Sequence, residues 1–253
     1  MPVKKLREGK NVVGTMVRMV KDPAVAWMAY HAGLGYIMLD LEHGQYTFET
    51  VGNIFKVGRA VGLGCFVRVP ELSKGYVSRV MDAGATGVMV PMLESVEQAR
   101  QLVAWSKYAP LGDRGFGTIG DHTNYAAVGA DTMASFMART NEETLAIAQI
   151  ETRRAIEEVD AIAAVPGIDA LLIGPNDLAI SLGCAGNLMG DALEKAIGKV
   201  AEAAKKHGKI FGLHAPDGLL ERWIPRGCAL VMSNLDISIL AAGMKAIAQK
   251  YKS

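Results

Sequence analysis

Short apolar runs alternate with longer amphipathic segments along almost the whole chain. The runs are rich in β-branched residues, and Gly, Pro or Asp punctuates each alternation. This pattern is typical of repeated βα units, because buried parallel strands read as continuous apolar runs. Eight strands are predicted, at residues 12–17, 36–41, 65–69, 87–91, 145–150, 170–173, 210–213 and 229–232.

The segments between these runs predict crossover helices. Residues 95–108, 152–163 and 193–207 are rich in Ala, Glu, Lys and Gln and carry apolar residues at helical spacing. Eight βα units in 253 residues predict an α/β fold, a (β/α)8 TIM barrel formed by one domain over residues 1–253. A doubly wound open sheet is the structural alternative.

One long irregular segment, residues 110–129, interrupts this alternation and could cover a site or meet a neighbouring subunit. Residues 115–120 within it match G-x-G-x-x-G. The match follows no hydrophobic strand and opens no clear helix, so it does not indicate a dinucleotide site.

Composition excludes several classes of partner. Lys and Arg total 27 against 26 Asp and Glu, so no excess of positive charge is available for nucleic acid or an anionic membrane. The longest apolar runs fall far short of the ~20 residues that span a bilayer. The first ten residues are charged and lead into no apolar signal sequence, which predicts a cytoplasmic protein. The three cysteines are far apart and are expected to be buried thiols.

Polar residues gather where the predicted strands end. In a barrel of this type the chemistry lies at the carboxyl ends of the strands. Asp40, Glu42 and His43 end the second strand, Arg68 ends the third, Gln149 and Glu151 end the fifth, and Asp177 follows the sixth. Ionisable side chains are therefore expected on one rim.

Glu151 and Asp177 are candidate metal ligands, because two carboxylates with carbonyls and waters suit a hard divalent cation. Few protein ligands leave coordination positions for the carboxylate and keto oxygens of a 2-oxo acid, whose enolate the metal would stabilise. The alternative is that each acid caps the helix after it.

Arg68 and His43 could serve such a substrate. A guanidinium at a barrel mouth needs an anionic substrate or a carboxylate partner in the protein, and both interpretations stay open for Arg68. Asp40 lies three residues before His43, close enough to orient its ring for general base chemistry. No predicted strand contains a lysine, which favours metal-dependent chemistry over a Schiff base.

Several ordered motifs resemble the HpcH/HpaI aldolase family over nearly the whole chain. They are Asp-Leu-Glu-His-Gly at 40–44, Val-Arg-Val-Pro at 67–70, Gln-Ile-Glu-Thr at 149–152 and Gly-Pro-Asn-Asp-Leu at 174–178. The resemblance implies a (β/α)8 barrel and a class II, metal-dependent pyruvate aldolase, such as 4-hydroxy-2-oxoheptanedioate aldolase or 2-dehydro-3-deoxyglucarate aldolase. It also implies a homohexamer, a trimer of dimers, with helix exchange between subunits.

Position by position, the resemblance implies roles for individual residues. Glu151 and Asp177 would bind Mg²⁺, Mn²⁺ or Co²⁺, and Arg68 and Gln149 would contact pyruvate. His43 would act as the base, oriented by Asp40. A further acidic family position is Asp82, and the backbone from Gly174 through Pro175 to Asn176 would share the pyruvate carboxylate at a helix start.

The expected reaction is cleavage or formation of a 4-hydroxy-2-oxo acid through a pyruvate enolate, with an aldehyde as the second product or substrate. Residues 116–128 do not match the aldolase members of the family, which leaves the aldehyde open. One alternative is a condensing or CoA-thioester-dependent enzyme of the citrate or citramalyl type on the same barrel. Another is a binding protein that keeps the pocket without turnover.

Overall fold

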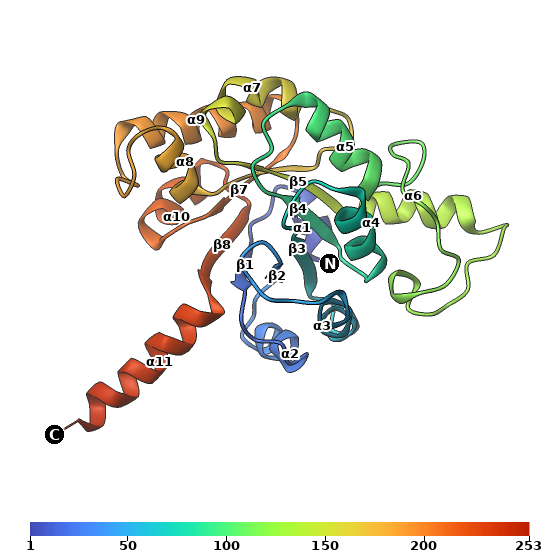
Figure 1. Ribbon diagram of the computed structural model, residues 1–253, viewed down its shortest axis with the longest axis horizontal. Coiled ribbons are helices and arrows are strands. Elements are labelled where there is room, and N and C mark those ends of the chain that lie inside the picture. The colour runs from blue at the N-terminus through green and yellow to red at the C-terminus, as the bar shows by residue number, and fades with distance from the viewer. Residues whose placement is uncertain (253) are drawn as a thin grey trace.

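Eight parallel strands close into a barrel in the computed structural model, which describes residues 1–252 (Figure 1). Each strand pairs with the next along the chain, and β8 pairs with β1. The (β/α)8 prediction is thereby confirmed, and the open sheet is excluded. The strands are β1 (Val12–Val17), β2 (Tyr36–Asp40), β3 (Gly64–Arg68), β4 (Gly87–Val90), β5 (Leu145–Ile150), β6 (Ala170–Ile173), β7 (Ile210–His214) and β8 (Leu230–Leu235).

Helices join the strands and surround the barrel. The predicted helices are confirmed as α5 (Val96–Ser106), α7 (Arg153–Ala163) and α9 (Asp191–Lys206). The others are α1 (Pro2–Arg7), α2 (Ala24–His31), α3 (Phe48–Ala60), α4 (Lys74–Asp82), α6 (Met133–Glu143), α8 (Pro175–Ser181), α10 (Asp217–Trp223) and α11 (Asp236–Tyr251), with short 3₁₀ turns η1 (Asp121–Thr123) and η2 (Ile224–Arg226). Within residues 1–252, no helix has the length and apolar character needed to cross a membrane.

Side chains alternate between the barrel interior and the helical layer. On β3, Phe66 belongs to the cluster that fills the interior, whereas Val67 packs in the cluster beneath the helices. The same alternation holds for Ile210 and Phe211 on β7. The hydroxyl of Tyr36 donates a 2.8 Å hydrogen bond to the carbonyl of Val231 across the filled interior. The barrel is therefore a packed core, and only its ends are available for chemistry.

The last helix, α11, does not pack on its own barrel. Figure 1 shows it extending from the end of β8 away from the rest of the chain. Asp236 at its start is buried and accepts hydrogen bonds from the backbone amides of Arg18, Met19 and Val20. Beyond that anchor the described helix is exposed, including Leu240, which is 41% exposed.

Candidate active site

The alternation along the strands turns several polar side chains inward at the carboxyl rim. Arg68 is two residues beyond interior Phe66, and Asp40 is two residues beyond interior Met38. Asp40 and Arg68 are also register partners on neighbouring strands. Since side chains two residues apart on a strand share a face, these charged groups meet above the packed core.

Glu151 is a buried carboxylate that forms no salt bridge among the described residues. Its side chain follows β5, and the residue is 2% exposed. The backbone amide of Met92 donates to Oε1 at 2.8 Å, and Nε2 of Gln149 donates to Oε2. Burial raises the pKa of Glu151 to about 7, and the negative charges of Asp177 and Glu42 add to the rise against the Met92 hydrogen bond and the charge of Arg68. Such a carboxylate favours a cation beside it.

Neither acid of the candidate metal pair is an N-cap. The N-cap of α7 is Thr152, whose side chain accepts from the amide of Ala155, and the N-cap of α8 is Gly174. Asp177 lies in the first turn of α8, close enough for its charge to act on the pKa of Glu151. The alternative interpretation of these acids as helix N-caps is therefore wrong.

Gly174 lets the start of α8 approach the Glu151 carboxylate. A Cβ at this position would lie 2.5 Å from Oε2 of Glu151 and 2.8 Å from Nε2 of Gln149. Within residues 1–252, no third His, Cys, Asp or Glu joins the two acids in a metal-binding group. Two carboxylates fit a hard divalent ion that keeps open positions for substrate and water.

Arg68 is held by two acids of β2 and the loop that follows it. Nε and Nη2 form a bidentate pair with Asp40 at 2.9 and 2.7 Å, and Nη1 lies 2.7 Å from Oε2 of Glu42. Nε of Arg18 is 2.8 Å from the same Asp40 carboxylate. Burial opposes ionisation of Asp40, but the two guanidiniums prevail and its pKa is lowered. Arg68 thus forms ion pairs with carboxylates of the protein, as one of its two interpretations predicted.

His43 stands at the outer edge of this cluster. Its side chain is 54% exposed, and Nε2 lies 3.9 Å from Oε2 of Glu42. Asp40 contacts the backbone amide of His43 at 3.3 Å, while its carboxylate is taken up by Arg68 and Arg18. The structure thus brings His43 to the rim, but the acid beside its ring is Glu42 rather than the predicted Asp40.

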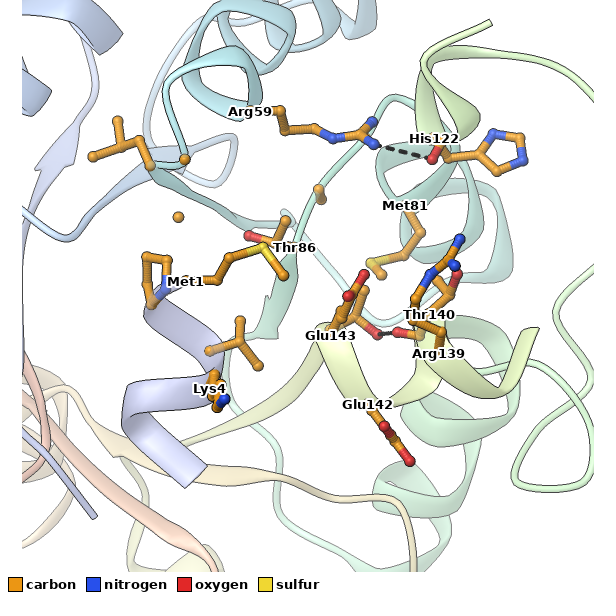
Figure 2. A pocket seen from close by; sticks show the side chains of 18 of the residues that line it. Met1, Lys4, Arg59, Met81, Thr86, His122, Arg139, Thr140, Glu142 and Glu143 are labelled. Carbon is orange, nitrogen blue, oxygen red and sulfur yellow. Dashed lines mark hydrogen bonds between the residues drawn. The ribbon is translucent and has the colours of Figure 1, made fainter. Parts of the chain in front are cut away.

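Asp82 lies at the opposite end of the barrel. It is the last residue of α4, which returns the chain to the amino ends of the strands, and it pairs with Nη2 of Arg114 at 2.7 Å. That end contains a cavity of about 690 Å³ lined by residues including Met1, Arg59 and Met81 (Figure 2). Within one chain, the structure does not bring Asp82 to Glu151, in contrast to the position expected for a catalytic acid.

The sequence left three contributors to the rim unassigned. Arg18 follows β1 and braces Asp40, Glu42 holds Nη1 of Arg68, and the Met92 amide holds Glu151. Met92 donates from a left-handed backbone conformation, with φ of 51°. The charged strand ends were a usable signal for Arg18 and Glu42. A methionine in a sequence does not indicate a positive φ, so the role of the Met92 amide could not be predicted.

A parallel barrel with an acid pair and a buried arginine at its carboxyl rim is typical of an enzyme of the (β/α)8 class. The family model of the HpcH/HpaI aldolase/citrate lyase family matches residues 18–226. The chain belongs to this family, which confirms both the resemblance and the expectation of a carbon–carbon lyase.

Relatives and solved structures agree with this assignment. A 4-hydroxy-2-oxovalerate aldolase of Novosphingobium aromaticivorans is 33% identical over 94% of this chain and 89% of its own length. A 5-keto-4-deoxy-D-glucarate aldolase of Shigella sonnei is 31% identical over 87% of this chain and 85% of its own. The crystal structure of an HpcH/HpaI aldolase from Desulfitobacterium hafniense covers 97% of this chain and 95% of its own, with 35% identity and a TM-score of 0.90.

Proposed function

We propose that the chain is a class II aldolase that cleaves or forms a 4-hydroxy-2-oxo acid, with pyruvate and an aldehyde as the other reactants. The observation that carries the proposal is the buried Glu151 carboxylate, which is held by the Met92 amide beside Asp177 and whose pKa stays raised although the charge of Arg68 acts on it. The aldolase names of the relatives support the same reaction class.

Glu151 and Asp177 would hold a divalent ion, of which Mg²⁺, Mn²⁺ and Co²⁺ are the candidates. When bound, such an ion supplies Lewis acidity to the keto oxygen of the 2-oxo acid. Gln149 is placed to contact the same substrate, because one N–H of its Nε2 lies on Glu151 and the second N–H can donate to an oxygen of the 2-oxo acid.

The substrate carboxylate has two candidate partners. The Nη1 edge of Arg68 faces Glu42, whose side chain is 21% exposed, whereas the other edge is committed to the fully buried Asp40. In our proposal the carboxylate takes the place of Glu42. The first-turn amides of Asn176 and Asp177 in α8 are the second partner; Pro175 ahead of them has no N–H to donate.

A pyruvate-release assay tests the proposal. Folded protein loaded with Mn²⁺ or Mg²⁺ is expected to release pyruvate from at least one member of a panel of 4-hydroxy-2-oxo acids, and removal of the metal by EDTA should abolish release. If metal-loaded protein cleaves nothing in the panel, while calorimetry detects tight CoA binding, the condensing or CoA-thioester-dependent alternative takes its place.

Replacing His43 by Ala should separate binding from turnover. In the proposed cleavage His43 accepts the proton of the C4 hydroxyl as the bond between C3 and C4 breaks. We expect aldol turnover to fall by about 10²- to 10⁴-fold, the usual size of a general base contribution. Calorimetry should find pyruvate affinity unchanged, because the His43 ring lies beside Glu42 and forms no contact with Arg68 itself. Unchanged turnover would remove His43 from the mechanism.

We further propose that α11 mediates self-association, in the trimer of dimers that the resemblance implies. Ile237, Leu240, Met244, Ile247 and Tyr251 follow a heptad spacing on one face and are 40–74% exposed. A face of this kind is typical of a helix that packs on a partner. Exposed apolar side chains on β1 and α2, including Val13 and Trp27, each 45% exposed, could contact α11 of a second copy.

Charged residues on that face should break the assembly. The double substitution Leu240→Asp with Ile247→Asp is expected to shift the protein from a hexamer to smaller species in light scattering, because each carboxylate would be buried without a partner. Gln249→Asp adds a negative charge on the opposite face of α11 and should leave the mass unchanged. A wild-type protein that is monomeric at micromolar concentration would contradict the proposal directly.

A further inference from the structure

His214 is an inward-facing side chain at the rim that the proposed reaction does not use. It is the last residue of β7, where Ile210 lies in the cluster that fills the barrel and Phe211 and Leu213 lie in the cluster beneath the helices. Alternation therefore turns His214 into the barrel, in the same orientation as Asp40 and Arg68. The residue is only partly buried, so its ring is accessible from the open end of the barrel.

One hydrogen bond fixes both the orientation and the tautomer of this ring. Nε2 lies 3.2 Å from the backbone carbonyl of Asn234, in the last part of β8. A carbonyl oxygen only accepts, so Nε2 carries the hydrogen. Asn234 is held in a left-handed conformation, with φ of 66°, which sets the direction of that carbonyl. In the neutral ring the lone pair then remains on Nδ1.

The surroundings keep the ring neutral. Burial lowers the pKa of His214 to about 4, and the positive charges of Arg68 and Arg18 add to this effect against the bond to Asn234 and the charge of Asp40. Nδ1 has no partner within residues 1–252 and is not among the enclosed polar atoms. At neutral pH Nδ1 of His214 is therefore a hydrogen-bond acceptor at the rim. No donor within the described chain bonds to it.

Resting on the proposed aldolase function, we propose that His214 is a specificity-determining residue, whose Nδ1 accepts a hydrogen bond from a hydroxyl group on the aldehyde half of the substrate. Only a donor satisfies that atom. An alkyl aldehyde offers it no donor, and a carboxylate would place a second acceptor against it. The substrate class is therefore a hydroxylated aldehyde rather than an aliphatic or acidic one.

Three two-carbon aldehydes of similar size test this inference in the condensation with pyruvate. Glycolaldehyde carries the hydroxyl, acetaldehyde carries none, and glyoxylate carries a carboxylate. For the full-length, metal-loaded protein we expect kcat/KM for glycolaldehyde to exceed that for each of the others by about tenfold, the size of one hydrogen bond. Equal use of glycolaldehyde and acetaldehyde, or preference for glyoxylate, would overturn the inference without any variant.

Two variants then assign the preference to the ring. His214→Leu should lower kcat/KM for glycolaldehyde about tenfold, chiefly through KM, and leave acetaldehyde unchanged. His214→Asn places an amide oxygen near the position of Nδ1 and should restore part of the preference. An equal loss for both aldehydes in the Leu variant would mean a structural role only. If no aldehyde condenses with pyruvate in the wild type, the aldolase proposal itself fails.

Discussion

Replacing Glu151 by Gln should abolish aldolase activity while leaving the barrel folded. Gln keeps the size of the side chain and an oxygen for the Met92 amide, which donates to Oε1 at 2.8 Å. It removes one of two carboxylates at a site where no third His, Cys, Asp or Glu of the described residues completes a metal-binding group. We expect divalent-ion affinity to fall at least 100-fold and kcat/KM to fall on the order of 10³-fold.

Both metal binding and aldolase activity must be measured for this variant. Calorimetric titration with Mn²⁺ reports the ion, and pyruvate release reports the reaction. Glu157→Gln, at an exposed position on α7, makes the same chemical change away from the rim and should alter neither. If the Glu151 variant bound Mn²⁺ as tightly as the wild type, Glu151 would not be a ligand, even if activity were lost.

The Glu151→Gln variant should also be at least as stable as the wild type without metal. Burial disfavours the charged form of this carboxyl group and raises its pKa to about 7. A neutral amide of the same shape avoids that penalty. Lost activity together with undiminished thermal stability in EDTA would therefore identify a residue kept for function rather than for folding.

The sequence predicted the barrel because burial on both faces leaves a clear pattern. Strands β5 and β6 were predicted with their observed bounds, since apolar runs at Leu145–Ile150 and Ala170–Ile173 are flanked by polar residues. Strand β8 was predicted to end at Met232 and continues to Leu235. Its last residues are more exposed, so the apolar run ended before the backbone pairing did.

The acid pair of the candidate site was also accessible from the sequence, because parallel strands bring their carboxyl ends to one rim. The pairing inside the charged cluster was not. Asp40 sits opposite Arg68 only through the register of β2 and β3, and a shift of two residues would pair Arg68 elsewhere. Which side chain pairs with a carboxylate depends on the folded structure. Sequence spacing and the family resemblance therefore both paired Asp40 with His43.

The position of Asp82 in the fold was not predicted from the sequence either. The resemblance placed it among the catalytic residues, whereas the fold carries the end of α4 to the amino ends of the strands. A helix that follows a strand always returns the chain to that end of the barrel. Asp82 could therefore reach a Glu151 site only in another copy of the chain, and the variants on α11 provide the means to ask whether activity depends on assembly.

Replacing Arg68 by Met should be both destabilising and inactivating. The wild-type guanidinium forms a bidentate pair with Asp40, whose side chain is fully buried, and a third contact with Glu42. Without it, Asp40 keeps the ion pair with Arg18 and the hydrogen bonds from the backbone amides of Glu42 and His43. Removing one partner of a buried pair costs about 3–5 kcal/mol, and Arg18 should hold the loss near the lower figure. Urea unfolding at pH 7 measures it.

A double substitution separates the two roles of Arg68. In Arg68→Met with Asp40→Asn the buried charge disappears together with its partner, so most of the lost unfolding free energy should return, because removing both members of a pair is far cheaper than removing one. Activity should not return. If Arg68 binds the substrate carboxylate through the edge that faces Glu42, kcat/KM should stay at least about 100-fold below wild type even in the stable double variant. Recovery of activity along with stability would show instead that Arg68 serves the fold of the rim, and that the amides at the start of α8 bind the carboxylate.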